Sequence, residues 1–152
     1  MKTGEIFNLF PQLLLNCMYP TLYINCRINE ELCGKCCYDT KMPLTKRDVE
    51  RIKKIGYPEE YFVDRRGRIP RLKNMKGHCV FLDPRTNACI IYPDRPEGCR
   101  LYPLIYDEEK DSIVVDPLCP KAHVVPHKLI IELSSALLSL IDRLRNEYLR
   151  SR

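Results

Sequence analysis

The sequence predicts an α+β fold: a small metal-stabilised domain with short β-hairpins, a loop-borne cysteine cluster and a long C-terminal helix. Three observations predict it. Nine cysteines occur in 152 residues, and most of them fall into groups. Short apolar runs flank turn-forming residues in the middle of the chain, a pattern typical of hairpins. The last part of the chain carries apolar residues at spacings of three and four, which indicates one long amphipathic helix.

The length and composition are those of a globular protein. Hydrophobic residues make up 45% of the chain and charged residues 30%, and 152 residues suit one domain with a real core. We therefore expect a single domain over residues 1–152. It comprises an N-terminal arm at 1–25, a cysteine-cluster core at 26–120 and a C-terminal helix at 126–152.

Cysteine usage predicts a reducing, cytoplasmic location. An odd number of cysteines leaves one thiol over in a fully paired disulfide framework. The apolar stretch at 6–15 is interrupted by Asn8, Pro11 and Gln12, unlike a secretory signal, and no run is long enough to cross a membrane. We expect clustered thiols that bind metal or perform redox chemistry, and no membrane partner. The alternative is the disulfide-rich cytosol of hyperthermophiles.

The net charge says little about partners. The value of +5 assumes neutral thiols; eight thiolates on two zinc ions, or on two cubane iron–sulfur clusters, would reduce it to about +1. Residues 64–76 contain six basic residues and one acidic residue. We interpret them as a solvated loop, because no aromatic residue is interleaved for base stacking. We do not expect nucleic acid as a partner.

Local patterns place the elements in order. The arm 1–25, which carries Cys17, is expected to be a short helix or irregular. Thr45 with Asp48 three residues later forms a capping-box pattern, which predicts a helix over 46–55 that ends at Gly56. Residues 79–92 read as a hairpin. A second strand pair is expected at 103–106 and 112–115, joined by a charged turn at 107–111.

The C-terminal helix is expected over 128–149. We expect its apolar stripe to pack on the domain core. A protein partner bound through this helix, such as a second copy, is the alternative. The stripe consists of Ile130, Leu133, Leu137, Leu140, Leu144 and Tyr148.

Eight cysteines form the most informative pattern. The first group is Cys26-x6-Cys33-x2-Cys36-Cys37, the second is Cys79-x9-Cys89-x9-Cys99, and Cys119 stands before Pro120. Gly34 allows a tight turn between Cys33 and Cys36, which would let following backbone N–H groups bond to the sulfurs.

Neighbouring side chains diverge, so Cys36 and Cys37 should serve different ions or a polynuclear centre, or one should be a free thiol. The relation between Cys79 and Cys89 depends on the hairpin turn. A five-residue turn at 83–87 places them on one face, and a four-residue turn places them on opposite faces.

The identity of the metal stays open between two classes. Structural zinc sites commonly use two C-x2–4-C turns, whereas this chain has one such turn and several single cysteines. Cysteine followed by proline, as at Cys119, also occurs in bacterial iron–sulfur ligation. The pattern slightly favours an iron–sulfur cluster over zinc.

These stretches resemble the YkgJ-like cysteine-cluster family, a zinc- or iron-chelating domain with a CxxCxxCC signature. The resemblance covers residues 26–120. The matching segments are 33–37 (CGKCC), 44–45 (LT), 79–83 (CVFLD), 89–92 (CIIY) and 95–103 (RPEGCRLYP). The resemblance implies eight metal ligands: Cys26, Cys33, Cys36, Cys37, Cys79, Cys89, Cys99 and Cys119.

The sequence shows one clear departure from the family pattern. The family has two residues between its first two cysteines, whereas six separate Cys26 from Cys33 here; either an insertion loops out or Cys26 is not equivalent. Flagellin lysine methylases resemble the family in their cysteine cluster. This chain has no glycine-rich strand-to-helix motif for a methyl-donor nucleotide, so we expect at most an accessory role in such chemistry.

The function predicted is metal binding: a module that holds zinc or an iron–sulfur cluster in a structural, electron-transfer or accessory role. One alternative is a redox or group-transfer enzyme that uses the cluster with Cys17 or Cys37. Another is a zinc-stabilised nucleic-acid-binding module that uses residues 65–76. Whether the chain is an enzyme stays open, because the three histidines are dispersed and form no evident catalytic pair. We also expect Arg95 or Arg100 to be buried against the cysteine loops.

Overall fold

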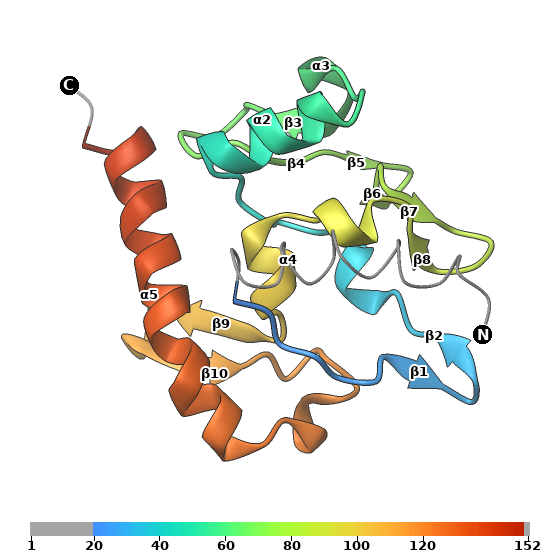
Figure 1. Ribbon diagram of the computed structural model, residues 1–152, viewed down its shortest axis with the longest axis vertical. Coiled ribbons are helices and arrows are strands. Elements are labelled where there is room, and N and C mark those ends of the chain that lie inside the picture. Colours follow the sequence, from blue (N-terminus) through green and yellow to red (C-terminus); the bar gives the residue numbers. More distant parts are fainter. Residues whose placement is uncertain (1–19, 151–152) are drawn as a thin grey trace, which may run out of the picture.

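The computed structural model describes residues 20–150 (Figure 1). Most of the N-terminal arm, including Cys17, lies outside the described residues. The helices are α2 (Lys46–Lys54), α3 (Glu59–Phe62), α4 (Glu97–Leu101) and α5 (His127–Tyr148), with short 3-10 turns at Lys35–Cys37, Tyr92–Asp94 and Ala122–Val124. Within residues 20–150, no helix has both the length and the apolar character needed to cross a membrane.

The strands of residues 20–150 form antiparallel pairs of two strands each. The pairs are β1 (Arg27–Ile28) with β2 (Glu31–Leu32), β3 (Val63–Asp64) with β4 (Arg71–Leu72), β5 (Asn74–Met75) with β6 (His78–Cys79), β7 (Leu82–Asp83) with β8 (Ala88–Cys89), and β9 (Leu104–Asp107) with β10 (Ser112–Val115). Short antiparallel hairpins and a long C-terminal helix confirm the predicted α+β class.

Buried apolar side chains form two clusters. The first, the cysteine core, contains Leu44, Val49, Ile52, Phe62, Val63, Leu72, Cys79, Val80, Phe81, Leu82 and Ile91. The second, the helix core, contains Leu22, Leu101, Leu104, Leu137, Leu140 and Leu144. The cysteine core is built from α2, α3 and the short strands, and the helix core lies where α5 covers β9 and β10 (Figure 1).

Helix α2 begins as the sequence predicts. The Thr45 side chain accepts a hydrogen bond from the Asp48 backbone N–H, and the Asp48 carboxylate accepts one from the Thr45 backbone N–H, so the capping box is complete. Ile55 ends the helix, and Gly56 follows with φ of 105°, which suits glycine. Val49 and Ile52 face the cysteine core. The predicted helix over 46–55 is therefore confirmed to within one residue.

The hairpin predicted over 79–92 is confirmed in its central part, as β7–β8, but it does not extend back to Cys79. Leu82 pairs with Cys89 and Asp83 with Ala88, so the turn has four residues, 84–87, rather than five. The parity argument about Cys79 and Cys89 does not apply, because a turn at Val80 and Phe81 separates β6 from β7 and the two cysteines do not lie in one hairpin. Cys79 instead belongs to the preceding hairpin, where it pairs with Asn74.

The C-terminal elements follow the prediction closely. Strands β9 and β10 pair from Leu104 opposite Val115 to Asp107 opposite Ser112. Along α5, Leu137, Leu140 and Leu144 are buried in the helix core, and the other members of the predicted stripe pack against it. The stripe therefore covers the protein's own core, which is the first of the two interpretations drawn from its periodicity.

Helix α4 connects the two cores. Its Leu101 lies in the helix core, while Cys99 packs against the cysteine core. Between them, a Cβ atom on Gly98 would collide with the Met42 sulfur and stand 3.8 Å from a Leu140 methyl group. Glycine at this position therefore permits close approach of side chains from both cores.

Candidate metal centre

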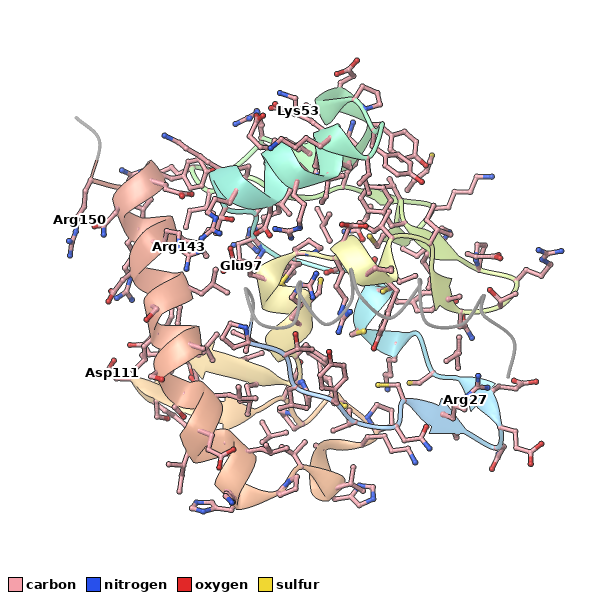
Figure 2. All side chains as sticks on the ribbon, viewed as in Figure 1. Arg27, Lys53, Glu97, Asp111, Arg143 and Arg150 are labelled. Carbon is pink, nitrogen blue, oxygen red and sulfur yellow. The ribbon has the colours of Figure 1, made fainter. Side chains whose placement is uncertain are left out.

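The structure brings the eight cysteines of residues 20–150 into one region as free thiols. Figure 2 shows yellow sulfur atoms between α4, the β1–β2 hairpin and the β7–β8 hairpin. The Cys36 thiol influences the ionisation of cysteines in both sequence groups and of Cys119. Segments as distant in sequence as 26 and 119 therefore share one electrostatic environment.

The β1–β2 hairpin explains the long spacing between Cys26 and Cys33. Arg27 pairs with Leu32, and the next pair outward is joined by a hydrogen bond from the Cys33 N–H to the Cys26 carbonyl, at 2.8 Å. Asn29 and Glu30 form the tip with φ of 50° and 67°, the left-handed geometry of a tight two-residue turn. Cys26 and Cys33 are thus cross-strand neighbours despite six intervening residues, so the insertion loops out as a hairpin.

Gly34 fixes the turn that follows. Its φ of 58° lies in the left-handed region, and the Cys37 N–H bonds to its carbonyl at 2.9 Å. A Cβ atom there would stand 2.8 Å from the Asn87 Cβ, in the turn between β7 and β8. The Tyr38 hydroxyl bonds to the Asn87 side chain at 2.9 Å. These contacts hold the first cysteine group against the second.

Four thiols pack against the cysteine core, and we call them the inner thiols. They are Cys37, Cys79, Cys89 and Cys99. Burial raises the pKa of Cys79 to about 11 and raises the pKa of Cys99 well above its usual range. The charged form of each inner thiol is therefore costly until a cation compensates it.

The other four thiols lie outside that core, and we call them the outer thiols. They are Cys26, Cys33, Cys36 and Cys119. Cys26 and Cys36 are exposed, and Cys33 and Cys119 are half-buried. Partial burial, and then the neighbouring thiols Cys36, Cys119 and Cys33, raise the pKa of Cys26.

The adjacent residues Cys36 and Cys37 share a hydrogen bond. It lowers the pKa of Cys36 to about 7 and raises that of Cys37, so the Cys36 sulfur is the acceptor and the Cys37 thiol the donor. Cys36 is thereby biased towards a thiolate, the form that binds metals.

Three cysteine loops direct a backbone N–H at their sulfur from the residue two positions later. The Phe81 N–H lies 3.5 Å from the Cys79 sulfur. The Ile91 N–H bonds to the Cys89 thiol and the Lys121 N–H to the Cys119 thiol, and each bond favours the thiolate against the opposing effect of burial. Such N–H donors stabilise thiolates that ligate metals.

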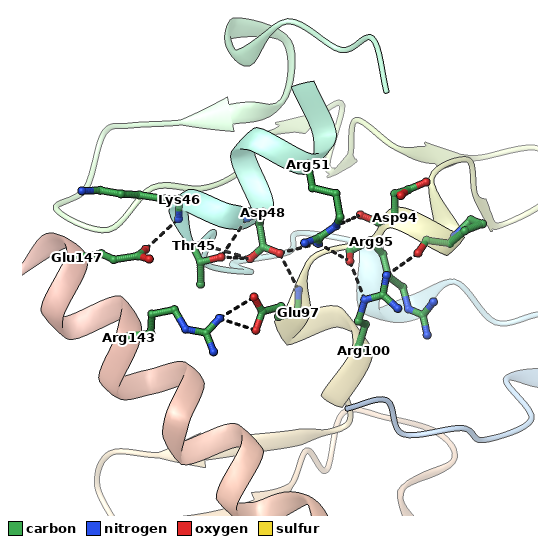
Figure 3. Close-up of polar contacts among 11 residues, drawn as sticks. Thr45, Lys46, Asp48, Arg51, Asp94, Arg95, Glu97, Arg100, Arg143 and Glu147 are labelled. Atoms are coloured by element: carbon green, nitrogen blue, oxygen red, sulfur yellow. Dashed lines mark hydrogen bonds and ion pairs between the residues drawn. The ribbon is translucent and has the colours of Figure 1, made fainter. Parts of the chain in front are cut away.

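Arg95 and Arg100 are both buried, as expected from the sequence. The Arg95 guanidinium stacks 3.8 Å from the centre of the Tyr92 ring and donates to the Tyr92 carbonyl. Its charge opposes the effect of burial on the pKa of Cys89 and Cys26. Arg100, only 1% exposed, donates to the carbonyls of Pro93 and Arg95, which precede Cys99 in the chain (Figure 3).

A buried polar network, which the sequence does not reveal, positions the same loop. Besides capping α2, the Asp48 carboxylate accepts from the Glu97 N–H at 3.0 Å and pairs with Arg51 at 2.7 Å (Figure 3). Arg51 in turn donates to the Arg95 carbonyl, and Glu97 pairs with Arg143 of α5. The capping-box pattern predicts the role of Asp48 at the start of α2. Its hydrogen bond with the Glu97 N–H, 49 residues away, depends on tertiary packing and is not visible in the sequence.

Two other sequence features have local roles. The His78 ring bonds to the Cys79 carbonyl and stands edge-on to the Tyr38 ring. In the basic stretch, Arg65 pairs with Glu59 and Arg66 with Asp64, while the Lys73 ammonium donates to the Glu60 carbonyl. These contacts favour the interpretation of the stretch as a surface segment with internal ion pairs.

The donor set fits a thiophilic metal. Thiolates are ligands that zinc and iron–sulfur clusters prefer, and the N–H donors and Arg95 compensate their charge. Within residues 20–150, no three or more Cys, His, Asp or Glu side chains form a ready-made metal-holding group.

Comparison with known proteins agrees with this chemistry. Residues 25–120, more than half of the chain, match the CxxCxxCC family, described as "Putative zinc- or iron-chelating domain". "Uncharacterized protein MJ0661" of Methanocaldococcus jannaschii is 40% identical over 77 residues, which cover 47% of this chain and 41% of that protein. The match thus spans about two fifths of the relative's length. No solved structure matches the chain. The protein belongs to the CxxCxxCC family of zinc- or iron-chelating domains.

Proposed function

We propose that the protein is a metal-binding module that holds zinc or an iron–sulfur cluster through its eight clustered thiols, as a structural or electron-transfer centre. The ligands are Cys26, Cys33, Cys36, Cys37, Cys79, Cys89, Cys99 and Cys119. The bound metal supplies cross-links between distant loops and, where it is an iron–sulfur cluster, a one-electron redox centre.

The observation that carries this proposal is the set of N–H donors aimed at the sulfurs. Cys79, Cys89 and Cys119 each receive a backbone N–H from the residue two positions later. Buried neutral thiols gain little from such donors, whereas thiolates gain much, because hydrogen bonds to ionised acceptors are roughly twice as strong. The loops are therefore shaped for the ionised, metal-bound form.

Charge balance supports the same conclusion. Four thiolates around one zinc ion or one cubane cluster leave a net charge of about −2. Arg95 is the buried cation whose charge acts on the thiols of Cys26, Cys36 and Cys89. Arg100 holds the carbonyls of the Arg95 loop and so fixes the position of that cation.

Anaerobic purification of the full chain, followed by metal analysis and absorption spectroscopy, tests the proposal. A brown protein that absorbs near ~400 nm and contains iron and sulfide identifies an iron–sulfur centre. A colourless protein with stoichiometric zinc identifies a structural site. A chain that retains neither metal after purification and reconstitution contradicts the proposal.

A redox titration separates the two roles. An iron–sulfur centre with an electron-transfer role bleaches reversibly on reduction while the far-UV circular dichroism stays constant. A structural centre gives no reversible spectral change, and its removal unfolds the cysteine loops.

A further inference from the structure

We propose that Cys26 and Cys33 form a reversible redox pair, whose oxidation joins the two strands of the β1–β2 hairpin by a cross-strand disulfide. The structure describes both cysteines as free thiols. The pair needs no bound metal, so the inference goes beyond the proposed function. One consequence rests on that function: the disulfide withdraws two thiols from the proposed ligand set.

The register of the hairpin places the two cysteines opposite each other. Arg27 pairs with Leu32, so the next pair outward joins Cys26 and Cys33. The Cys33 N–H donates to the Cys26 carbonyl at 2.8 Å, which confirms this register. Residues directly opposite in an antiparallel pair project their side chains from the same face. Both thiols therefore lie on one side of the hairpin.

The backbone spacing of such a pair suits a disulfide. Opposite residues of an antiparallel pair have Cα atoms about 4.5 to 5.5 Å apart, and disulfides usually join Cα atoms about 4.4 to 6.8 Å apart. The cross-link therefore needs rotation of two side chains and little movement of the backbone. The tip is fixed before oxidation, because Asn29 and Glu30 form a tight turn and the Arg27 guanidinium donates to the Glu30 carbonyl at 2.6 Å.

Small molecules have access to both thiols. The hairpin lies at the edge of the molecule, away from α5 (Figure 1). Cys26 is exposed and Cys33 is half-buried. Cys33 also lines a surface cavity of about 380 Å³, together with Tyr38 and Pro120. Cys79, by contrast, is only 3% exposed. A low-molecular-weight disulfide therefore reaches the hairpin thiols before it reaches the thiols of the cysteine core.

The oxidation is a thiol–disulfide exchange with a low-molecular-weight disulfide as the oxidant. The Cys33 thiolate attacks one sulfur of the oxidant, forms a mixed disulfide and releases one small thiol. The Cys26 thiolate then attacks the Cys33 sulfur, closes the hairpin disulfide and releases the second small thiol. The two protons of the cysteines end on the two released thiols, and two electrons pass to the oxidant. An excess of the small thiol reverses both steps.

Other nearby cysteines are the alternative partners. Cys36 follows Cys33 in a C-x2-C spacing, and the Cys119 thiol interacts electrostatically with those of Cys26 and Cys33. In the strand pairs of residues 20–150, neither Cys36 nor Cys119 is held opposite a hairpin cysteine. The strand register therefore favours Cys26 as the partner of Cys33.

Oxidation in glutathione redox buffers tests the inference on the full chain. Trypsin cuts after Arg27 and Lys35 and so separates Cys26 from Cys33; Cys17→Ser removes the other cysteine from the peptide of Cys26. After acid quenching and alkylation of free thiols with a maleimide, mass spectrometry should find these two peptides joined. The pair should oxidise at a ratio of oxidised to reduced glutathione about tenfold lower than any other pair requires, and dithiothreitol should reverse the reaction.

Matched variants and an unfolded control test the choice of partner. Cys26→Ser should leave Cys33 as a mixed disulfide with glutathione, whereas Cys36→Ser and Cys119→Ser should keep the hairpin disulfide. In urea the pairing should spread over several cysteines, because the hairpin no longer selects one partner. Pairing of Cys33 with Cys36 or Cys119 in the folded chain, or the same pairing with and without urea, overturns the inference.

Comparison of the metal-loaded and chelator-treated chains separates this inference from the proposed function. Bound metal should slow the oxidation about tenfold or more, because it stabilises the reduced thiols by mass action. Equal rates with the metal retained overturn the exclusion of metal by the disulfide. A chain that binds no metal and still joins Cys26 to Cys33 contradicts the proposed function and supports the redox pair. Absence of this disulfide in both chains overturns the redox pair, while metal binding itself stands.

Discussion

The two cores of this protein are stabilised in different ways. The helix core lies between α5, of 22 residues, and the hairpin β9–β10, whose strands have four residues each. The cysteine core lies among two-residue strands and the short helices α2 and α3. Long elements satisfy their own backbone hydrogen bonds and bury a continuous stripe, whereas two-residue strands make few hydrogen bonds and need other cross-links.

This contrast indicates which core a bound metal would stabilise most. No cysteine is a member of the helix core within residues 20–150, whereas Cys79 is a member of the cysteine core and three further thiols pack on it. The helix core is therefore formed by apolar side chains without a thiol among its buried members. The cysteine core combines apolar burial with thiols from a 3-10 turn, two short strands and α4, which we propose as metal ligands. Metal binding should act mainly on one half of the fold.

Metal removal should have the largest effect on the relative stability of the two cores. Structural metal sites contribute on the order of 10 kcal/mol to folding, so chelation should unfold the segments around the cysteine core. Hydrogen exchange followed by mass spectrometry should show lost protection over 44–91 and persistent protection in α5. A metal-free protein with unchanged melting and uniform protection would contradict the comparison.

Removal of the buried Asp48 carboxylate should have the next largest effect on stability. Asp48→Ala removes the buried carboxylate that pairs with Arg51 and accepts from the Glu97 N–H, and it removes the cap of α2, so the free energy of unfolding should fall by about 3 kcal/mol. Denaturant titration of the metal-loaded protein measures the change. The control is Glu50→Ala, which breaks an exposed pair with Lys53 on the same helix and should have no resolvable effect. Equal effects of the two variants would contradict the role assigned to Asp48.

Arginine-to-lysine changes probe the link between the loop and the metal. Arg100→Lys removes a planar fork that bonds two carbonyls, and Arg95→Lys removes a stacked cation, so each should weaken metal retention by about 1 kcal/mol. Competition with a chelator of known affinity measures retention. Full retention and unchanged melting in both variants would show that neither guanidinium supports the site.

The smallest expected effect is at Cys17. It lies outside the cysteine pattern shared with the family, so Cys17→Ser should leave the metal content unchanged, while Cys36→Ser should lower it. Metal analysis of the purified variants compares them directly. Equal loss in both would identify Cys17 as a further ligand.

The elements with local signals could be predicted from the amino-acid sequence. The capping box at Thr45 and Asp48 specified the start of α2, and the apolar stripe specified α5, because both patterns arise from interactions within a few residues along the chain. The family, and with it the expected metal-chelating chemistry, could also be recognised from the sequence, because the cysteine spacings and the segment around Cys99 match the family pattern.

How segments distant in sequence meet depends on tertiary packing. The spacing of Cys26 and Cys33 was ambiguous until the hairpin placed them opposite each other. The strand through Cys79 was wrongly extended, because the turn at Val80 and Phe81 carries neither glycine nor proline. The division between inner and outer thiols depends on packing against a core whose members come from across some 50 residues. Spacing along the chain cannot encode which thiol is buried, because burial is a property of the assembled core.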